Sequence, residues 1–369
     1  MSKMVWSSVN DYAGERALLT EFVTVAGRRA PLYAAFAAGA AEQPEVLSIL
    51  AAAPAASRLP VTLFAAIHFL LLADPGEPLA AWYPNLVDQP RTDDGIPALV
   101  EFCQRRRGEL IDIVTSRVPQ TNEIGRSAVL MLGLTQVADE VGALGQVDVG
   151  ASAGLNLLSD RYRYRWGDQV VGGGDIEVSC RIDGALPTGF PPSDLARIAS
   201  RVGLDRAPVD IGDPDQVRWL EACVWPDQAD RFVRLRAALD QAVALRPLVV
   251  AGDAVDDLAA TVARIDAGHP VITTSWVLNY LDQTDQARFW AQLNALGRQQ
   301  DLSWVAYEAP DLTRGLSWPE SHAHESLSVL RVARWRHGRL DDAVVGRGHP
   351  HGYWLEWGSA LTAVAAQHL

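Results

Sequence analysis

From residue 146 onward, short apolar segments alternate with amphipathic ones, and this alternation constrains the fold more than any other feature of the chain. Strands are predicted near residues 146–149, 197–204, 247–251, 270–274 and 302–307. Amphipathic helices are predicted between most of them, near residues 154–160, 214–222, 227–243, 255–266 and 284–298. Because strands that alternate with helices form a parallel sheet covered on both faces, we predict an α/β fold.

Two more strands are predicted near residues 331–336 and 353–357, joined by a polar connection without a helix. Such a pair indicates an antiparallel hairpin at one edge, which brings the mostly parallel sheet to seven strands. Residues 161–195 interrupt the alternation and predict an inserted β-hairpin. Arginine and aromatic residues alternate over residues 161–166, which fits either an anion-binding surface or a solvated ribbon.

The chain before residue 146 is predicted to be helical. Apolar residues recur there at three- and four-residue spacings in the stretches 30–53, 97–118 and 130–141. We expect the last of these helices to begin near Thr121 and Asn122, which are good N-cap residues. We therefore predict two domains, an all-helical N-terminal domain of residues 1–145 and an α/β domain of residues 146–369.

Composition argues against several classes of protein. The net charge of −13 disfavours a nucleic-acid partner, because proteins that bind phosphate backbones present basic surfaces. No apolar run is long enough to cross a membrane, and the N-terminal residues lack the pattern of a secretory signal. The three cysteines are too few and too widely spaced for a disulfide framework. We therefore predict a cytoplasmic protein with neither a nucleic-acid nor a membrane partner.

The segment after the first predicted strand has two competing interpretations. Asp148, Gly150 and Gly154 form the pattern Asp-x-Gly-x-x-x-Gly, whose glycines let a ligand approach the backbone at a sharp turn. With Ser152 between them, the glycines also form Gly-x-Ser-x-Gly, a formal match to the nucleophile turn of α/β-hydrolases. A hydrolase needs earlier strands, since one of their loops supplies half of the oxyanion hole, and none is predicted. We therefore favour the ligand-binding loop.

Acidic residues end each of the first three predicted strands, at Asp148, Asp205 and Asp253. Together with the glycine loop and the Rossmann-like sheet, this order resembles the class I methyltransferases that depend on S-adenosylmethionine. The resemblance implies S-adenosylmethionine as cofactor, held by Asp148, Gly150, Ser152, Gly154, Asn156, Asp205, Asp253 and Ala254. The second acid would take the ribose hydroxyls, and the third would accept from the adenine amino group. Ser152 departs from the family's pattern, which usually has glycine there.

The segment after the fourth predicted strand contains Trp276, Asn279 and Tyr280. In the methyltransferases that the chain resembles, the backbone and an aromatic side chain flank the sulfonium at this place. The resemblance therefore assigns Trp276 and Asn279 to the cofactor and Tyr280 to the substrate. An aromatic face beside the cation would contribute about 0.5–2 kcal/mol. Packing of both aromatic rings in the core is the alternative.

The whole chain is also similar to an uncharacterised bacterial family, a domain of unknown function with a helical N-terminal half and a methyltransferase-like C-terminal half. Five groups of residues carry this likeness, namely 120–126, 150–156, 160–164, 224–226 and 350–352. They span most of the chain and are specific in combination. The resemblance implies the fold and no particular reaction.

Three residues are candidates for the chemistry, Glu123, Arg126 and His351. On the predicted helix, Asn122 and Arg126 lie four residues apart and share a face. Arg126 would bind a substrate carboxylate, Glu123 would act as a base and Asn122 would contact the substrate. The alternative is a helix cap and a surface ion pair worth under about 1 kcal/mol. His351 is either a base near neutral pH or a turn residue.

Two further groups of ionisable residues carry less weight. His322 and His324 lie two apart with Glu325 adjacent, but no cysteine or histidine at matching spacing completes a site, so no metal is predicted. Glu308 ends the fifth predicted strand and is a further possible base.

We therefore predict a methyltransferase that acts on a small-molecule acceptor, with the helical domain shaping the acceptor pocket. A non-catalytic nucleotide-binding protein of the same fold is the first alternative. The second alternative is a serine hydrolase that combines Ser152 with Asp253 and with His322 or His349.

Overall fold

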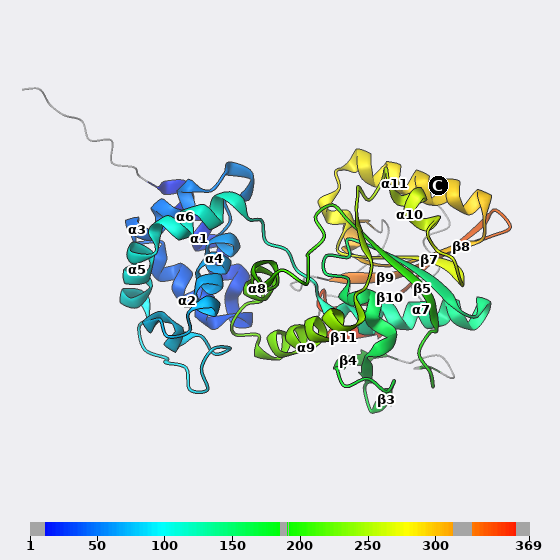
Figure 1. The fold of residues 1–369 in the computed structure, drawn as a ribbon, viewed down its shortest axis with the longest axis horizontal. Coiled ribbons are helices and arrows are strands. Elements are labelled where there is room, and N and C mark those ends of the chain that lie inside the picture. Colours follow the sequence, from blue (N-terminus) through cyan, green and yellow to red (C-terminus); the bar gives the residue numbers. More distant parts are fainter. Residues whose placement is uncertain (1–11, 185–189, 191, 313–326, 359–369) are drawn as a thin grey trace, which may run out of the picture. The chain divides into compact units, whose positions relative to one another are not determined.

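The computed structural model describes residues 12–184, 190, 192–312 and 327–358. The chain divides into two compact units (Figure 1). The helical unit comprises Met1–Thr121 and Asp213–Val233, and the sheet unit comprises Asn122–Gly212 and Arg234–Leu369. The histidine group at residues 322–325 lies outside the described residues.

The helical unit consists of helices joined by short turns. Its helices are α1 (Ala13–Ala26), α2 (Pro31–Ala40), α3 (Pro44–Ala52), α4 (Pro60–Ala73), α5 (Ile96–Arg105), α6 (Arg107–Ser116), α8 (Pro214–Ala222), the beginning of α9 (Ala229–Leu245), and the 3-10 helices η1 (Gly27–Arg29), η2 (Ala55–Ser57) and η3 (Pro78–Trp82). Proline begins α2, α3, α4 and α8, where its restricted φ and missing N–H suit the first turn. No strand lies between residues 12 and 143, as predicted.

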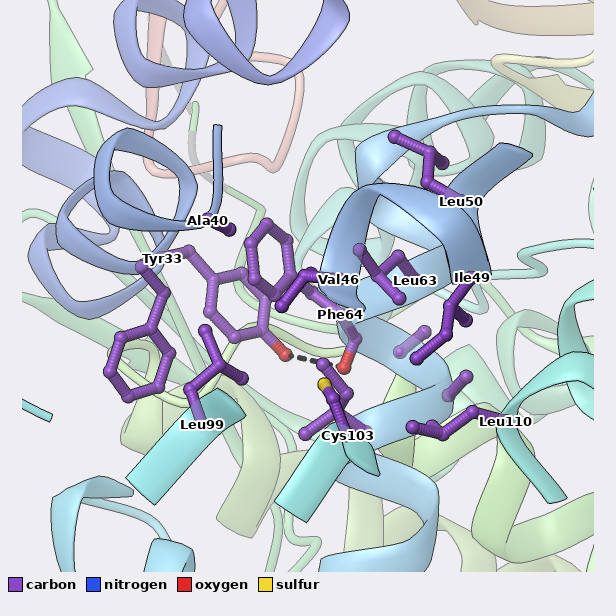
Figure 2. Close-up of a cluster of buried hydrophobic side chains, with 14 of the residues drawn as sticks. Tyr33, Ala40, Val46, Ile49, Leu50, Leu63, Phe64, Leu99, Cys103 and Leu110 are labelled. Atoms are coloured by element: carbon purple, nitrogen blue, oxygen red, sulfur yellow. Dashed lines mark hydrogen bonds between the residues drawn. The ribbon is translucent and has the colours of Figure 1, made fainter. Parts of the chain in front are cut away.

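Helix α4 is the centre of the helical unit, because it is apolar around nearly its whole circumference and Thr62–Leu71 are all buried. Figure 2 shows Phe64 of α4 beside Tyr33 of α2; the ring centroids are 4.8 Å apart, and the Tyr33 hydroxyl donates to the Phe64 carbonyl oxygen. Leu50 of α3 and Cys103 of α5 join the same cluster. Despite this apolar character, none of the helices that the structure describes is long and apolar enough to cross a membrane.

The sheet unit is built on one mixed sheet of eleven strands in the order β3-β2-β4-β11-β10-β9-β8-β7-β1-β5-β6. The strands are β1 (Leu144–Val149), β2 (Arg163–Trp166), β3 (Gln169–Val171), β4 (Glu177–Asp183), β5 (Ile198–Asp205), β6 (Val249–Ala251), β7 (His269–Ser275), β8 (Leu302–Glu308), β9 (Ser328–Arg336), β10 (Arg339–Gly348) and β11 (Trp354–Trp357). The helices are α7 (Ser127–Val141), α10 (Leu258–Val262), α11 (Gln283–Gln299), the end of α9, and the 3-10 helices η4 (Ile124–Arg126), η5 (Leu155–Arg161), η6 (Leu278–Tyr280) and η7 (Pro310–Leu312). The predicted α/β class is confirmed.

Five neighbouring strands, β6-β5-β1-β7-β8, are parallel. Along the chain, β5 and β6 follow β1 on one side, and β7 and β8 are then added on its other side. The direction of winding therefore reverses between β1 and β7. In open α/β sheets, ligands bind outside the carboxyl ends of the strands at such a reversal, so this geometry positions the candidate site.

The predicted count of seven strands is wrong, partly because the polar connection after β9 is itself a strand, β10. It pairs antiparallel with both β9 and β11, so the predicted hairpin of β9 with β11 does not form. The charges of β10 have cross-strand partners, since Asp342 pairs with Arg331 and Arg347 pairs with Glu356. Charges that are neutralised across strands remove the apolar alternation by which a strand is recognised.

The predicted insertion contributes the remaining strands and continues the sheet. β2 and β3 form the expected hairpin, and β4 pairs parallel with β2 on one side and with β11 on the other. Tyr164 and Trp166 are buried and stacked, and the Trp166 indole N–H donates to the Ala128 carbonyl of α7. Arg163 and Arg165 face outward and share Glu177. The segment is therefore a sheet edge with one buried face, not a ribbon solvated on both sides.

Helices cover both faces of the central strands (Figure 1), as alternate residues of β8 demonstrate. A Cβ on Gly133 of α7 would lie 2.7 Å from Val305 Cγ1, so α7 packs closely on one face. Trp304 points to the other face, where it shares a core cluster with Phe289 and Leu293 of α11. This arrangement follows from the period-two alternation of side chains along a strand.

The two units differ in extent from the predicted domains of residues 1–145 and 146–369. Helix α7 belongs to the sheet unit because it packs on β8 and β4. Helix α8 belongs to the helical unit, where Trp219 packs edge-on against Phe69 of α4. Within the sheet unit, the helix predicted at 154–160 is the 3-10 helix η5, and the one predicted at 255–266 is the shorter α10.

Gly297 near the end of α11 tests the packing of helix on sheet. A Cβ there would lie 2.1 Å from Trp335 Cγ, whereas a Cβ on Gly108 of α6 would meet no atom within 4 Å. We expect Gly297→Ala to lower the free energy of unfolding by about 1–3 kcal/mol through overpacking. Gly108→Ala should instead raise it by up to about 1 kcal/mol through helix propensity. Thermal and urea unfolding of both variants measures these two changes. Equal stabilisation by the two alanines would contradict the close packing of α11 on Trp335.

Candidate functional site

The candidate site lies along the carboxyl ends of the strands, called here the carboxyl rim. β1, β5 and β6 supply one half of the rim, and β7 and β8 supply the other. β10 reaches the same rim, because β8 and β10 are both antiparallel to β9 and so run in one direction. The rim therefore includes the loop after β1, the turn after β7 and the turn after β10.

The loop after β1 is held in place by hydrogen bonds to β5 and within itself. Gly150, Ser152 and Gly154 have φ values of 73°, 53° and 74°, a region that favours glycine. The Gly150 N–H donates to the Leu204 carbonyl at 2.8 Å, and the Gly154 N–H donates to the Ala151 carbonyl at 2.7 Å. The Ser152 N–H donates to the Asp205 carboxylate at 2.8 Å. Because the N–H groups of Gly150, Ser152 and Gly154 already have acceptors in β5 or in the loop, these three groups do not form a phosphate cradle.

The three predicted acids lie at or near the carboxyl ends of the neighbouring strands β1, β5 and β6, but their environments differ. Asp148 is buried, and the Thr273 hydroxyl donates to it at 2.7 Å. Burial, with a smaller effect of Asp205, raises the pKa of Asp148 to about 7. Asp205 is partly exposed and accepts the N–H groups of Ser152 and Ala207 through its two carboxylate oxygens. A buried acid and a partly exposed acid therefore lie on the neighbouring strands β1 and β5.

Asp253, the third acid, begins the turn that leads into α10. Its Oδ1 accepts the Val255 N–H at 2.8 Å, and its Oδ2 accepts from the Arg206 guanidinium at 2.8 Å. The backbone hydrogen bond from Val255 and then the Arg206 guanidinium lower the pKa of Asp253. Asp253 and the neighbouring Ala254 remain partly exposed, so a ligand on the rim can reach them.

Two predicted loop residues are buried with a polar atom unsatisfied. Ser152 Oγ and Asn156 Oδ1 form no hydrogen bond within the described part of the chain. Ser152 therefore has no general base beside its hydroxyl among those residues, as a serine nucleophile would require. His322, one partner considered for a triad, lies outside the described ranges.

The segment Asn122–Arg126, called here the strap, crosses the rim. The structure contradicts the prediction that Asn122 and Arg126 share a helix face, because α7 begins only at Ser127 and Glu123 is extended. The close approach of two chain segments explains this difference. A Cβ on Gly125 would lie 2.3 Å from the His351 carbonyl oxygen, and a Cβ on Gly352 would lie 2.1 Å from that of Gly125.

The strap connects both halves of the rim through hydrogen bonds. Asn122 Oδ1 accepts the Leu155 N–H at 3.1 Å, which ties the strap to the loop after β1. The buried Arg126 guanidinium donates to the Ser275 carbonyl at the end of β7, at 3.1 Å, and to the Pro350 carbonyl after β10, at 2.8 Å. The strap therefore braces the loop after β1, the end of β7 and the turn after β10.

Glu123 and His351, predicted from opposite ends of the sequence, lie together. Glu123 Oε2 is 3.3 Å from His351 Nδ1, and the other carboxylate oxygen accepts the Gly125 N–H at 2.8 Å. The Glu123 side chain is 3% exposed and that of His351 is 24% exposed. A buried carboxylate that contacts Nδ1 orients the imidazole and stabilises its protonated form. The pair can therefore act as an oriented acid–base group.

Trp276 follows β7 with a φ of 59°, which is unusual for a bulky residue. Its indole N–H donates to the Ser328 hydroxyl at 2.6 Å, and the Arg126 guanidinium lies over its ring at 5.7 Å from the centroid. The aromatic face predicted to lie near a sulfonium thus carries an arginine. Trp276 and Ser152 place strained backbone at the ends of β7 and β1, on both sides of the reversal. Such strain is concentrated at functional sites.

The other residues predicted after β7 point away from the core. Tyr280 is 81% exposed, and Asn279 is also exposed. The alternative that both aromatic residues pack in the core is therefore wrong for Tyr280.

Three residues on the rim were given little or no role by the sequence. Glu308 ends β8 and accepts the N–H groups of Val277 and Leu278, and burial raises its pKa to about 7. The rings of His349 and Tyr353 lie 4.7 Å apart, and His349 Nδ1 accepts the His351 N–H. The sequence features that could have indicated these residues are an acid at the end of an apolar strand, for Glu308, and a histidine-rich turn, for His349 and Tyr353.

A cavity of about 440 Å³ lies beside the loop after β1, and its walls include Ala153, Val209, Arg246 and Pro247. None of the three predicted acids lines it. Among the residues that the structure describes, no cluster of histidine, cysteine or acidic side chains could hold a metal ion.

A family model described as "Uncharacterized protein conserved in bacteria (DUF2332)" matches residues 16–357. The match confirms the similarity to an uncharacterised bacterial family that the sequence indicated. No curated protein and no solved structure matches the chain.

The raised pKa of Asp148 predicts a pH dependence of stability. Between about pH 4 and pH 7, the folded state keeps a proton that the unfolded state has lost, so stability falls as the pH rises through this window. Asp148→Asn removes this titration and keeps an oxygen for the Thr273 hydroxyl. We expect the variant to match wild type near pH 4 and to exceed its free energy of unfolding by up to about 4 kcal/mol at pH 8.

Urea unfolding of both proteins between pH 4 and pH 8 measures this difference, from which the titration of Glu308 cancels because both proteins retain it. A difference that does not change with pH would show that Asp148 titrates normally in the folded protein.

Proposed function

The chain belongs to the DUF2332 family, and we propose that it is a methyltransferase that transfers a methyl group from S-adenosylmethionine to a small molecule. The observation that carries the proposal is the reversal of the sheet between β1 and β7, with acids at or near the carboxyl ends of β1, β5 and β6 on one rim. We propose that β6-β5-β1-β7-β8 is a class I methyltransferase-like core. The additional strands β9–β11 and β2–β4 extend that core on its β8 side.

The residues of the rim fit such a cofactor better than they fit a dinucleotide. A pyrophosphate requires N–H donors, and those of Gly150, Ser152 and Gly154 already donate to β5 or within the loop. S-adenosylmethionine has no phosphate, and its ammonium and ribose hydroxyl groups are donors that need acceptors. Asp205 offers a partly exposed carboxylate with lone pairs left beyond the two N–H groups that it accepts.

Gly150, Asp205, Asp253 and Ala254 would therefore contact the cofactor, which supplies an electrophilic methyl group when bound. The buried Asp148, Ser152, Gly154 and Asn156 would act indirectly, through the shape of the loop. We keep Asn279 and Tyr280 as candidate contacts to cofactor and substrate. Trp276 would serve mainly through Arg126, whose charge its ring already faces.

The second half of the rim supplies the acid–base chemistry in this proposal. An acceptor with an O–H or N–H group must lose a proton when its heteroatom is methylated. His351 takes that proton, and Glu123, in contact with His351 Nδ1, orients the ring and stabilises the imidazolium. Arg126 positions both by holding the Pro350 carbonyl beside His351 and the end of β7. Asn122 fixes the strap to the loop after β1 through its hydrogen bond with the Leu155 N–H.

A non-catalytic nucleotide-binding protein is the alternative that a specific observation favours. A Cβ on Gly150 would lie 2.4 Å from Val277 Cγ2, so Val277 occupies one side of the glycine that a ligand would approach. If Val277 keeps this position when a ligand is bound, the loop stabilises the fold and does not contribute to catalysis. The hydrolase has less support, because Ser152 Oγ lacks a hydrogen-bonded base among the described residues.

Binding of S-adenosylhomocysteine tests the cofactor half of the rim. We expect wild type to bind it in isothermal titration calorimetry and Asp205→Asn to bind at least about tenfold more weakly, because charge-assisted hydrogen bonds to the ribose are lost. Asp266→Asn is the matched control, since Asp266 is exposed ahead of β7, at the amino ends of the strands. Absence of binding to wild type would refute both the methyltransferase and its nucleotide-binding alternative.

An assay of methyl transfer tests the half of the rim that is proposed to supply the acid–base chemistry. With an acceptor found in a library of small amines, thiols and hydroxy compounds, His351→Gln should lower kcat by about 10²–10⁴-fold through loss of the base. Affinity for S-adenosylhomocysteine should stay within about twofold, because His351 is not assigned to the cofactor. Glu123→Gln should lower the apparent pKa of the pH–rate profile, a change that a merely structural role would not produce. Unchanged turnover in His351→Gln would exclude His351 as the base.

A further inference from the structure

The helical unit contains a cavity of about 520 Å³, a volume typical of small-molecule sites, that the proposed methyl transfer does not use. Its walls come from α2, from the segment between η3 and α5, and from the connection between α8 and α9. The residues that matter for the argument are Leu32, Phe36, Trp82, Arg91, Asp94 and Asp227.

Two buried aromatic side chains form the apolar part of this cavity. Phe36 is 2% exposed and Trp82 is 6% exposed. The segment that carries Gly95 lies directly on both rings, because a Cβ on Gly95 would be 2.8 Å from Phe36 Cε1 and 3.0 Å from Trp82 Nε1. The Trp82 indole N–H is used by the Asp93 carbonyl at 2.9 Å. Both rings are therefore fixed in position by the chain around them.

The charges around the cavity are unbalanced. Its lining contains the carboxylates of Asp93, Asp94 and Asp227 and the guanidinium of Arg91. Arg91 and Asp93 form an ion pair with each other, which leaves the charges of Asp94 and Asp227 without a cation in the lining. Asp227 is partly buried and accepts the Leu32 N–H at 3.1 Å, and burial raises its pKa. A cation beside Asp227 would offset the cost of burying this carboxylate.

The wall of the cavity already holds one organic cation from the chain itself. The Arg91 guanidinium lies 4.1 Å from the centroid of the Trp82 ring, while its Nε donates to Asp93 at 2.9 Å. An aromatic face together with a carboxylate is the combination that recognises organic cations in proteins. Phe36 and Asp227 also line the cavity and are the same two kinds of group, an aromatic ring and a carboxylate.

We propose that this cavity is a binding site for an organic cation, a primary ammonium group carried on an apolar body. The ammonium group pairs with Asp227, and the apolar body lies against Phe36 and Trp82. The carboxylate supplies selectivity for charge, and the aromatic rings supply the contact area. The site is independent of the proposed methyl transfer.

Three probes of matched shape test the proposal on the full chain by isothermal titration calorimetry: 4-phenylbutylamine, 4-phenylbutanol and 4-phenylbutyrate. We expect the amine to bind at least about tenfold more tightly than the alcohol, and the carboxylate to bind least. Asp227→Asn should remove the preference for the amine, and its amide oxygen can still accept the Leu32 N–H. Glu42→Gln is the matched control, because Glu42 is an exposed acid of the same unit outside the cavity lining.

Arg91→Ala provides a second readout that does not depend on the folding of the Asp227 variant. Removal of the competing cation uncovers the Trp82 ring and makes the lining more negative, so the amine should bind more tightly. A purely structural role of the Arg91–Asp93 pair would leave the affinity unchanged or lower it. Equal affinity for amine and alcohol, retained preference in Asp227→Asn, or no binding of the amine up to about 10 mM would each overturn the proposal.

Discussion

The buried guanidinium of Arg126 is the interaction on which the carboxyl rim depends. It donates to a carbonyl at the end of β7 and to another after β10, and its face lies over Trp276. A planar group with several fixed donors suits this task better than a lysine would. Hydrogen bonds from a charged group contribute about 1.5–3 kcal/mol each, and loss of the group would remove both of these at once. One side chain thus holds together turns that are far apart in sequence.

The same constraint explains why the chemical groups lie where they do. The strap has room beside the turn after β10 only because Gly125 and Gly352 let two backbones approach. That approach brings Glu123 to His351, and the next residue back, Asn122, reaches the loop after β1. A methyl donor at the first half of the rim and a base at the second would then face one another across the reversal of the sheet. The proposed methyl transfer relies on that geometry.

The spacing of apolar residues in the sequence was sufficient to predict those elements whose structure depends on interactions between residues close in sequence. The alternation of apolar strands with helices predicted the five parallel strands, and helical spacings predicted the first unit. The acids Asp148, Asp205 and Asp253 lie on one rim because parallel strands place their carboxyl ends together. Pattern failed for β10, whose charges are neutralised by residues on β9 and β11 that the sequence does not reveal as neighbours.

The sequence by itself determined the class of fold, the helical character of the first unit, and the residue types available at the strand ends. Tertiary structure alone decided that Asn122–Arg126 is a strap rather than the first turn of an α-helix, since helix propensity yields there to contacts with residues more than 200 positions away. It also decided which acids are buried and which are exposed. Burial and long-range contact depend on the packing of distant segments, and local spacing carries no information about that packing.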